Sequence, residues 1–263
     1  MDPLVERHYR ALAERYDELL RWSPDFVPTH ARRMVDRLEL EADDLLVDLG
    51  CGPGIYARAI LEIRPLTQPV IGVDPFAEML AEIPDDVPIT PVQADAVTFS
   101  SRPGRYDKVL MKEAVHHVDR KRELFENLHE RLTEGGILLL VNVDPHLVEY
   151  PLFDAALERC RTRFADPDEM VRLLGEAGFE VAREVLAYHH RVPTERYVEM
   201  VENRYMSVLT SFDDDELRAG IEQMRARYGD RAVLEFPESF DYLTARPAAS
   251  AEAPPRGHAS AGG

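Results

Sequence analysis

The chain has very few cysteines. Cys51 and Cys160 are the only two in 263 residues, they lie far apart, and neither belongs to a C-x-x-C or zinc-type spacing. This excludes a disulfide framework, offers no metal site and is typical of a reducing compartment. Long hydrophobic runs are also missing, and the N-terminus has no signal-peptide core. We therefore expect a cytoplasmic protein that binds no metal and contacts no membrane.

Positive charge is scarce as well. The 31 Lys and Arg residues face 49 Asp and Glu residues, which gives a formal net charge of −18. Because such a surface repels polyphosphate, nucleic acid is excluded as a partner and a small-molecule substrate is favoured. Arginine is strongly preferred to lysine, which suggests GC-rich coding and a bacterial source. The oligomeric state, monomer or homodimer, stays open.

The length fits one α/β domain with an added cap better than two independent domains. Apolar residues at helical spacing predict N-terminal lid helices within residues 1–40. A change of pattern predicts a helical cap insert over residues 193–229, so that 41–192 and 230–246 form the main domain. Residues 247–263 are rich in Ala, Pro, Ser and Gly, and we expect a disordered tail there.

Strand and helix patterns alternate through the main domain. Strands are predicted at 45–49, 70–74, 92–95, 106–111, 137–143 and 179–192, with 234–242 as a closing strand or hairpin. Helices are predicted at 55–63, 76–83, 119–135, 166–178, 198–209 and 213–228. Asp119 is expected to cap the third helix and Gly135-Gly136 to end it, and Asp213 and Glu216 are expected to cap the last helix. Pro91 places the third strand near a sheet edge. This order predicts a parallel sheet covered on both faces.

A glycine-rich turn follows the first predicted strand, in the segment Asp48-Leu49-Gly50-Cys51-Gly52-Pro53-Gly54. In an open α/β sheet, ligands bind beyond the carboxyl ends of the strands, and this turn lies there. Asp74 ends the second strand, where its carboxylate can accept hydrogen bonds from ribose hydroxyls. Taken alone, the glycines fit any tight turn, and Asp74 could merely cap the next helix. The combination is more specific than either part.

These motifs resemble those of the class I S-adenosylmethionine-dependent methyltransferases, in particular the group similar to the ubiquinone and menaquinone methyltransferases. The likeness covers about residues 9–185 and includes Gln93-Ala94-Asp95-Ala96 and Thr133-Glu134-Gly135-Gly136. It implies a Rossmann-like seven-stranded, mostly parallel sheet of order 3-2-1-4-5-7-6 with an antiparallel strand 7. The two-helix insert departs from the plainest members of the family.

The resemblance also implies a cofactor site for S-adenosylmethionine. Asp48 and the backbone of Gly50, Gly52 and Gly54 would hold the methionine moiety, and Asp74 the ribose. Asp95 and Ala96 would hold the adenine, and Tyr16 would close over the cofactor. Cys51, Pro75, Met79 and Lys112 adjoin these motifs and are expected in the same site. Cys51 also fits as loop filler, and Met79 as ordinary helix core.

Candidate catalytic residues follow the fourth strand in Lys112-Glu113-Ala114-Val115-His116-His117. Histidine can take a proton from an acceptor group near neutral pH, so Glu113, His116 and His117 are candidates for acid–base roles. The alternatives are a local Lys-Glu ion pair and a His-His pair that merely opens the next helix. Methyl transfer by in-line displacement depends chiefly on aligning the acceptor and excluding water.

The acceptor pocket is expected among aromatic and apolar side chains of the lid and cap, which suit an apolar or aromatic acceptor. The same side chains fit equally well as the core of the cap. Two other functions stay open: a cyclase or hydroxylase that keeps the cofactor for structural reasons, and a non-enzymatic cofactor-sensing protein. The candidate pocket residues are Tyr9, Tyr150, Tyr197, Tyr205 and Met206.

Overall fold

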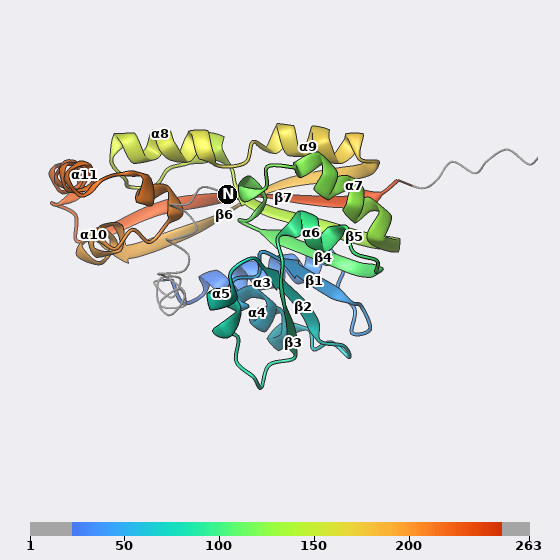
Figure 1. Ribbon diagram of the computed structural model, residues 1–263. Helices are drawn as coiled ribbons and strands as arrows, with labels where there is room; N and C mark the ends of the chain where they lie inside the picture. The colour runs from blue at the N-terminus through green and yellow to red at the C-terminus, as the bar shows by residue number, and fades with distance from the viewer. Residues whose placement is uncertain (1–22, 249–263) are drawn as a thin grey trace, which may run out of the picture.

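The computed structural model describes residues 23–248 and shows one seven-stranded sheet (Figure 1). Its strand order is β3-β2-β1-β4-β5-β7-β6, in which only the pairings of β7 with β5 and β6 are antiparallel. This confirms the predicted order and the antiparallel strand 7. The strands are β1 Leu46–Leu49, β2 Val70–Asp74, β3 Ile89–Gln93, β4 Tyr106–Lys112, β5 Leu132–Val143, β6 Phe179–Pro193 and β7 Val233–Pro247.

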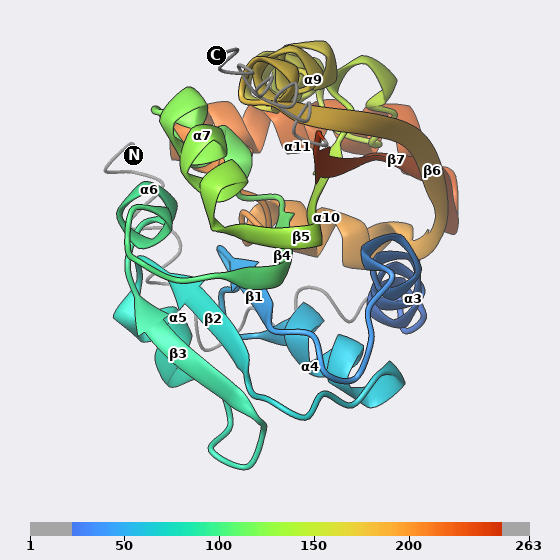
Figure 2. The same cartoon turned by 90° about the vertical axis from the view of Figure 1, so that its right-hand side faces the viewer.

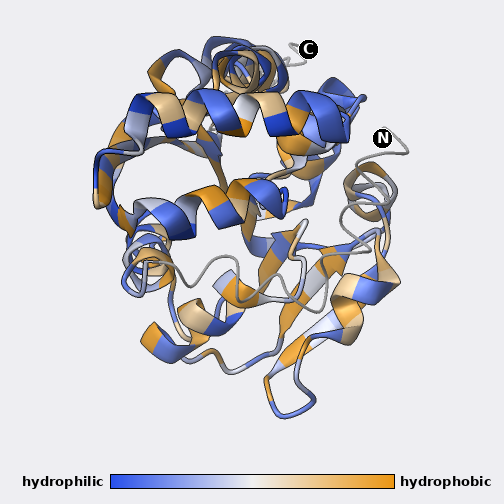
Figure 3. Ribbon diagram, turned by 90° about the vertical axis from the view of Figure 1, so that its left-hand side faces the viewer, coloured by the Kyte–Doolittle hydropathy of each residue, from blue (hydrophilic) through white to orange (hydrophobic). Residues whose placement is uncertain are grey.

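Helices cover both faces of the sheet (Figure 2). Two separate clusters of buried hydrophobic residues lie beneath them. One cluster lies under α3 (Phe26–Leu38) and α4 (Ile55–Ile63), and the other under α6 (Ala96–Ser100), α7 (Lys121–Arg131) and α9 (Pro167–Glu176). Figure 3 shows hydrophobic and hydrophilic residues interleaved along the helices, as expected for elements with one buried side. The remaining helices are α5 Ala77–Ala81, α8 Asp154–Arg163, α10 Thr194–Glu202 and α11 Asp214–Tyr228, with the short 3-10 turns η2 Val115–His117, η3 Pro145–Leu147 and η4 Ser207–Ser211.

The edge position of β3 is confirmed, although the strand begins at Ile89 and not at Val92. Pro91 lacks a backbone N–H, and an edge strand tolerates this because one side of it needs no ladder partner. The edge strand brings its carboxyl end beside that of β2, because Asp74 pairs with Gln93.

The predicted limits of the third helix are wrong. Helix α7 has Arg120 at its N-cap, without a side-chain cap, and ends at Arg131. The β4–β5 pairing then shifts from Tyr106 opposite Leu132 to Lys108 opposite Ile137, so the residues between them form an irregularity within β5. Gly135 has a φ of +77° there. Its left-handed conformation serves this bulge and does not end the helix.

Strands β6 and β7 form a long antiparallel pair (Figure 1). The segment that connects them contains α10, η4 and α11. The prediction of one helix through Leu209 is wrong, because α10 ends at Glu202 and Arg204 adopts a φ of +53°. The predicted cap of the next helix is confirmed: Asp213 and Glu216 form a reciprocal capping box at the start of α11.

Several predictions lie outside the described residues. These are the part of the predicted lid helices that precedes residue 23, with Tyr9 and Tyr16, and the tail from residue 249 onward. β7 continues to Pro247, where the tail was expected to begin. Among residues 23–248, no helix is long and apolar enough to cross a membrane. Within the same residues there is no group of three or more His, Cys, Asp or Glu side chains that could hold a metal ion.

Candidate active site

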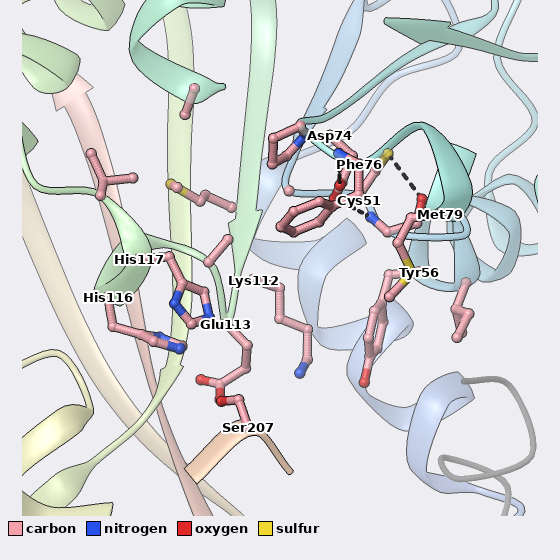
Figure 4. A pocket seen from close by; sticks show the side chains of 18 of the residues that line it. Cys51, Tyr56, Asp74, Phe76, Met79, Lys112, Glu113, His116, His117 and Ser207 are labelled. Carbon is pink, nitrogen blue, oxygen red and sulfur yellow. Dashed lines mark hydrogen bonds between the residues drawn. The ribbon is translucent and has the colours of Figure 1, made fainter. Parts of the chain in front are cut away.

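A cavity of about 580 Å³ lies beyond the carboxyl ends of β1, β2 and β4 (Figure 4). One end is lined by the glycine turn, Asp74 and Asp95. The other is lined by aromatic side chains from α3, from the segment after β5, from the α10–α11 segment and from β7. The cavity lies where open α/β sheets bind their ligands. The volume falls within the range of small-molecule sites.

The glycine turn is tied to the neighbouring strand. The amides of Gly50 and Cys51 donate to the Val73 carbonyl at 2.7 and 3.1 Å. Gly50 and Gly52 have φ values of +78° and +53°, a region that favours glycine. A Cβ at Gly52 would meet no atom within 4 Å, and the residue lines the cavity, so the bare backbone here leaves room for a ligand. Gly54 is the N-cap of α4 and does not line the cavity.

Asp74 is buried at the end of β2, and its carboxylate accepts two backbone hydrogen bonds. The amides of Gly52 and Phe76 donate to its two oxygens, each at 2.9 Å. Burial raises the pKa of Asp74, and these two hydrogen bonds oppose that rise. A carboxylate has about four lone-pair positions, so two remain for hydroxyl donors of a ligand. Asp74 thus both caps the local backbone and retains acceptor capacity toward the cavity.

Asp48 lies beneath the turn and does not line the cavity. Burial, and then the charge of Asp74, raise its pKa to about 7. Cys51 lines the cavity, and its thiol donates weakly to the Gly52 carbonyl at 3.4 Å. Burial raises the pKa of Cys51, which keeps the thiol protonated and unreactive. This fits the interpretation of Cys51 as loop filler.

The expected adenine end is assembled by α5 and α6. Asp95 is the N-cap of α6 and accepts from the amides of Val97 and Thr98 at 3.1 and 3.0 Å. Burial raises the pKa of Asp95, but hydrogen bonds from the Thr98 hydroxyl and these amides outweigh it, so the pKa is lowered. Three other predicted residues line the same end, namely Pro75, Met79 and Ala96. Met79 is also almost fully buried, so it serves the core and the cavity wall together.

Lys112 ends β4 with its ammonium group among aromatic rings. Its Nζ lies 4.6 Å from the ring centre of Tyr56, 4.9 Å from that of Phe240 and 6.0 Å from that of Phe26. Contacts at these distances are cation–π interactions. Neither Tyr56 nor Phe240 was predicted, although Tyr56 occupies the first turn of the helix that follows the glycine motif.

Glu113, His116 and His117 come together on the cavity wall beside Lys112 (Figure 4). Glu113 has a φ of +51°, and its carboxylate accepts from the Val143 amide at 2.6 Å. Burial raises its pKa. The two imidazole rings are 4.0 Å apart, and burial lowers both pKa values, that of His117 to about 4. Both rings are therefore neutral at pH 7 and weakly basic.

Of the predicted acceptor residues, the structure brings Tyr150, Tyr205 and Met206 to the cavity. Tyr197 is fully buried behind them, and its hydroxyl lies 3.0 Å from that of Tyr205. Glu238 on β7 was missed, yet it lines the cavity. The signal was present in the sequence: alternate strand residues share a face, so Glu238 interrupts an otherwise aromatic face.

Comparison with known proteins agrees with this arrangement. A family model described as a methyltransferase domain matches residues 18–184, more than half of the chain. A trans-aconitate 2-methyltransferase of Paracidovorax citrulli is 32% identical over 112 residues, which cover 42% of this chain and 43% of that protein. A trans-aconitate 2-methyltransferase of Methylobacterium radiotolerans is 28% identical over 80% of this chain and 90% of its own length.

Solved structures show the same fold. A protein of Anabaena variabilis, described as a methyltransferase from an antibiotic biosynthesis pathway, matches with a TM-score of 0.62 at 19% identity. The match covers 81% of this chain and 96% of that protein. Together with the matching family model, the sheet order and the glycine turn followed by Asp74, this shows that the chain belongs to the class I S-adenosylmethionine-dependent methyltransferases, with S-adenosylmethionine as its cofactor.

Proposed function

We propose that the protein transfers a methyl group to a small acceptor with an apolar or aromatic body. One observation carries this proposal: a single cavity joins an end lined by Asp74 and Asp95 to an end lined by Tyr150, Tyr205 and Phe240. The first end offers acceptor groups for a nucleoside. The second offers ring surfaces for an acceptor, as apolar ligand sites do.

The residues present fit the cofactor. The open space at Gly52 leaves room against the backbone, and Asp74 has free acceptor positions for ribose hydroxyls. When bound, S-adenosylmethionine supplies a methyl group on a positively charged sulfur. Asp95, Ala96, Pro75 and Met79 would hold the adenine, while Gly50, Cys51 and Lys112 would border the methionine moiety.

In this proposal the protein acts chiefly by alignment and by excluding water, which together can supply roughly 7 to 11 kcal/mol. Tyr205 and Met206 come from the segment after α10, which fits a cap over the acceptor. Residues 1–40 and 193–229 are proposed to form this cover together. Glu113, His116 and His117 stay candidates for taking a proton. The neutral, desolvated state of the two histidines favours shaping the wall over strong base catalysis.

Trans-aconitate, which the named relatives methylate, is the second candidate acceptor. It carries three carboxylates and calls for several cations. The described acceptor end presents the ammonium of Lys112 together with the carboxyl groups of Glu113 and Glu238. One cationic and two carboxyl side chains favour an acceptor with less negative charge than trans-aconitate.

Supplying the protein with S-adenosylmethionine and either trans-aconitate or a set of small phenols tests this choice. We expect S-adenosylhomocysteine to form with a phenol and not with trans-aconitate. Faster formation with trans-aconitate would overturn the preference for an aromatic acceptor. A changed acceptor without S-adenosylhomocysteine would indicate a cyclase or hydroxylase, and binding of the cofactor without any reaction would indicate a sensor.

Replacing Asp74 by asparagine should lower the affinity for S-adenosylmethionine about tenfold. The amide keeps the shape but removes the charge from the hydrogen bonds to ribose, and charge-assisted bonds are roughly twice as strong as neutral ones. It also puts an NH2 donor in place of one of the two oxygens that accept the amides of Gly52 and Phe76. Calorimetric titration measures the effect, with Asp85→Asn, at an exposed position outside the cavity, as the control. Equal affinity of both variants and the wild type would remove Asp74 from the site.

A further inference from the structure

A chain of hydrogen bonds runs behind the acceptor end of the cavity. Ser23 Oγ lies 3.0 Å from His190 Nδ1, and His190 Nε2 lies 2.7 Å from Glu238 Oε2. The Tyr150 hydroxyl donates to the other oxygen of Glu238. Because Nε2 faces a carboxylate, it carries the imidazole proton, and Nδ1 then accepts from the Ser23 hydroxyl. Ser23 and His190, which lie 167 positions apart in the sequence, thus form one chain that holds the Glu238 carboxylate in place.

Glu238 faces the cavity from the end of this chain. It is one of the lining residues, and its side chain is 12% exposed, while the side chain of His190 has no exposed surface. Among residues 23–248, its hydrogen bonds come from His190 and Tyr150, one to each oxygen. About two lone-pair positions of the carboxylate are therefore left for a donor inside the cavity.

Stability alone does not explain a carboxylate at this position. Burying a carboxylate costs desolvation free energy, and apolar side chains of the same volume are often at least as stable as a buried charged group with its partners. The neighbours of Glu238 on the same strand face are Phe236 and Phe240, both buried. An apolar residue would fit that surface at lower desolvation cost, so the acid and its dedicated histidine point to a ligand.

Tyr56 supplies an independent sign of the ligand's chemistry. It lines the same cavity, and its hydroxyl is buried without a hydrogen-bond partner. Burial raises the pKa of Tyr56, and the charges of Glu238 and Glu113 raise it further, so the phenol keeps its proton. Figure 4 shows its side chain beside that of Lys112, with the hydroxyl and the amine toward the same end. A buried donor left unpaired costs roughly 1–3 kcal/mol, which a ligand oxygen would relieve.

We propose that Glu238 recognises a hydroxyl group of the acceptor, that Tyr56 donates to the same hydroxyl oxygen, and that His190 is the positioning residue that holds the Glu238 carboxylate. A hydroxyl both donates and accepts, so one group satisfies both side chains. A deprotonated carboxylate of the acceptor would satisfy Tyr56 and be repelled by Glu238. The acceptor class is thus a neutral alcohol or phenol on an aromatic or apolar body. This inference rests on the proposed function, because it places the acceptor in the cavity.

Two probes test the inference, one with a hydroxyl hydrogen and one with a methyl group in its place. These are 4-methylphenol and its methyl ether 4-methylanisole, each titrated by NMR into protein saturated with S-adenosylhomocysteine. We expect the wild type to bind the phenol at least tenfold more tightly, and Glu238→Gln to reduce this preference to about twofold or less. The affinity for S-adenosylhomocysteine should stay the same. Glu235→Gln, on the exposed side of β7, is the matched control and should keep the preference.

His190 is tested in the same assay with two substitutions. His190→Leu should lose the preference for the phenol, and His190→Gln, which can still donate to Glu238, should restore most of it. Thermal melting shows that each variant is folded. If His190 only filled the core, its substitutions would lower the melting temperature and leave the preference for the phenol over the ether unchanged.

The outcomes distinguish this inference from the proposed function. If the wild type fails to bind S-adenosylhomocysteine, the proposed function itself is contradicted. If S-adenosylhomocysteine binds but the two probes bind equally, or 4-methylphenol does not bind, the role of Glu238 is overturned. Loss of the preference in Glu235→Gln would overturn it too.

Discussion

Substituting alanine for Gly52 is expected to lower the affinity for S-adenosylmethionine at least thirtyfold while the protein stays folded. Gly52 lines the cavity and the added methyl group meets no protein atom within 4 Å, so we expect this group to take up space that the cofactor needs. Overpacking at a contact costs typically 1–3 kcal/mol, and about 2 kcal/mol corresponds to thirtyfold. The φ of +53° adds about 1–2 kcal/mol of strain to the folded protein. Calorimetry and thermal melting measure the two effects separately.

Gly50 provides the matched comparison, because its expected defect is in stability. A Cβ at Gly50 would lie 2.5 Å from the Cβ of Ala114, at a φ of +78°. Gly50→Ala should therefore destabilise the fold by about 2–5 kcal/mol, and adding Ala114→Gly should recover the part due to the clash. If Gly52→Ala bound the cofactor normally, or lost as much stability as Gly50→Ala, the role of Gly52 in leaving room for the cofactor would be wrong.

Replacing Asp48 by asparagine is expected to stabilise the protein by about 2–4 kcal/mol at pH 8. The folded pKa of about 7 lies above the ordinary aspartate value of 3.8, so the folded state holds a proton that the unfolded chain releases. The contribution of Asp48 to the stability of the wild type therefore falls as the pH rises from about 4 to 7, and then stays level. Asparagine carries no charge at any pH, so Asp48→Asn does not lose stability in this pH range through ionisation at position 48.

Denaturant unfolding at pH 4 and pH 8 measures the Asp48 effect. The wild type and Asp48→Asn should differ little at pH 4 and most at pH 8. A less stable variant at pH 8 would show that the Asp48 carboxylate is held by favourable interactions in the folded state. The expected gain also indicates that a costly buried acid is retained beneath the cofactor turn for function, as at other active sites.

The parts of the fold predicted from the sequence were those encoded in local patterns. The glycine turn, the acid that ends β2 and the alternation of strands and helices led to the sheet order through the family resemblance. The capping box at Asp213 could be predicted because both of its partners lie within one turn of helix. The named relatives are trans-aconitate methyltransferases, so the finer likeness to ubiquinone and menaquinone methyltransferases has no support from them.

The missed features depend on tertiary packing. Gly135-Gly136 looked like a helix end, but the register of β4 against β5 places these residues in a bulge. Tyr197 and Tyr205 looked equivalent, yet the fold buries the first and exposes the second to the cavity. Glu238 interrupts an aromatic strand face in the sequence, but its partners His190 and Tyr150 were known only from the structure. Helical or strand spacing cannot report such contacts, since each partner comes from a distant part of the chain.

The most direct test of methyl transfer is to incubate the purified protein with S-adenosylmethionine labelled in its methyl group and a bacterial metabolite extract. Mass spectrometry then counts labelled products and S-adenosylhomocysteine in the same sample. We predict a labelled, hydroxyl-derived small molecule and one S-adenosylhomocysteine for each label transferred. A product that forms without the label, or intact S-adenosylmethionine in the presence of every metabolite, would contradict methyl transfer by this chain.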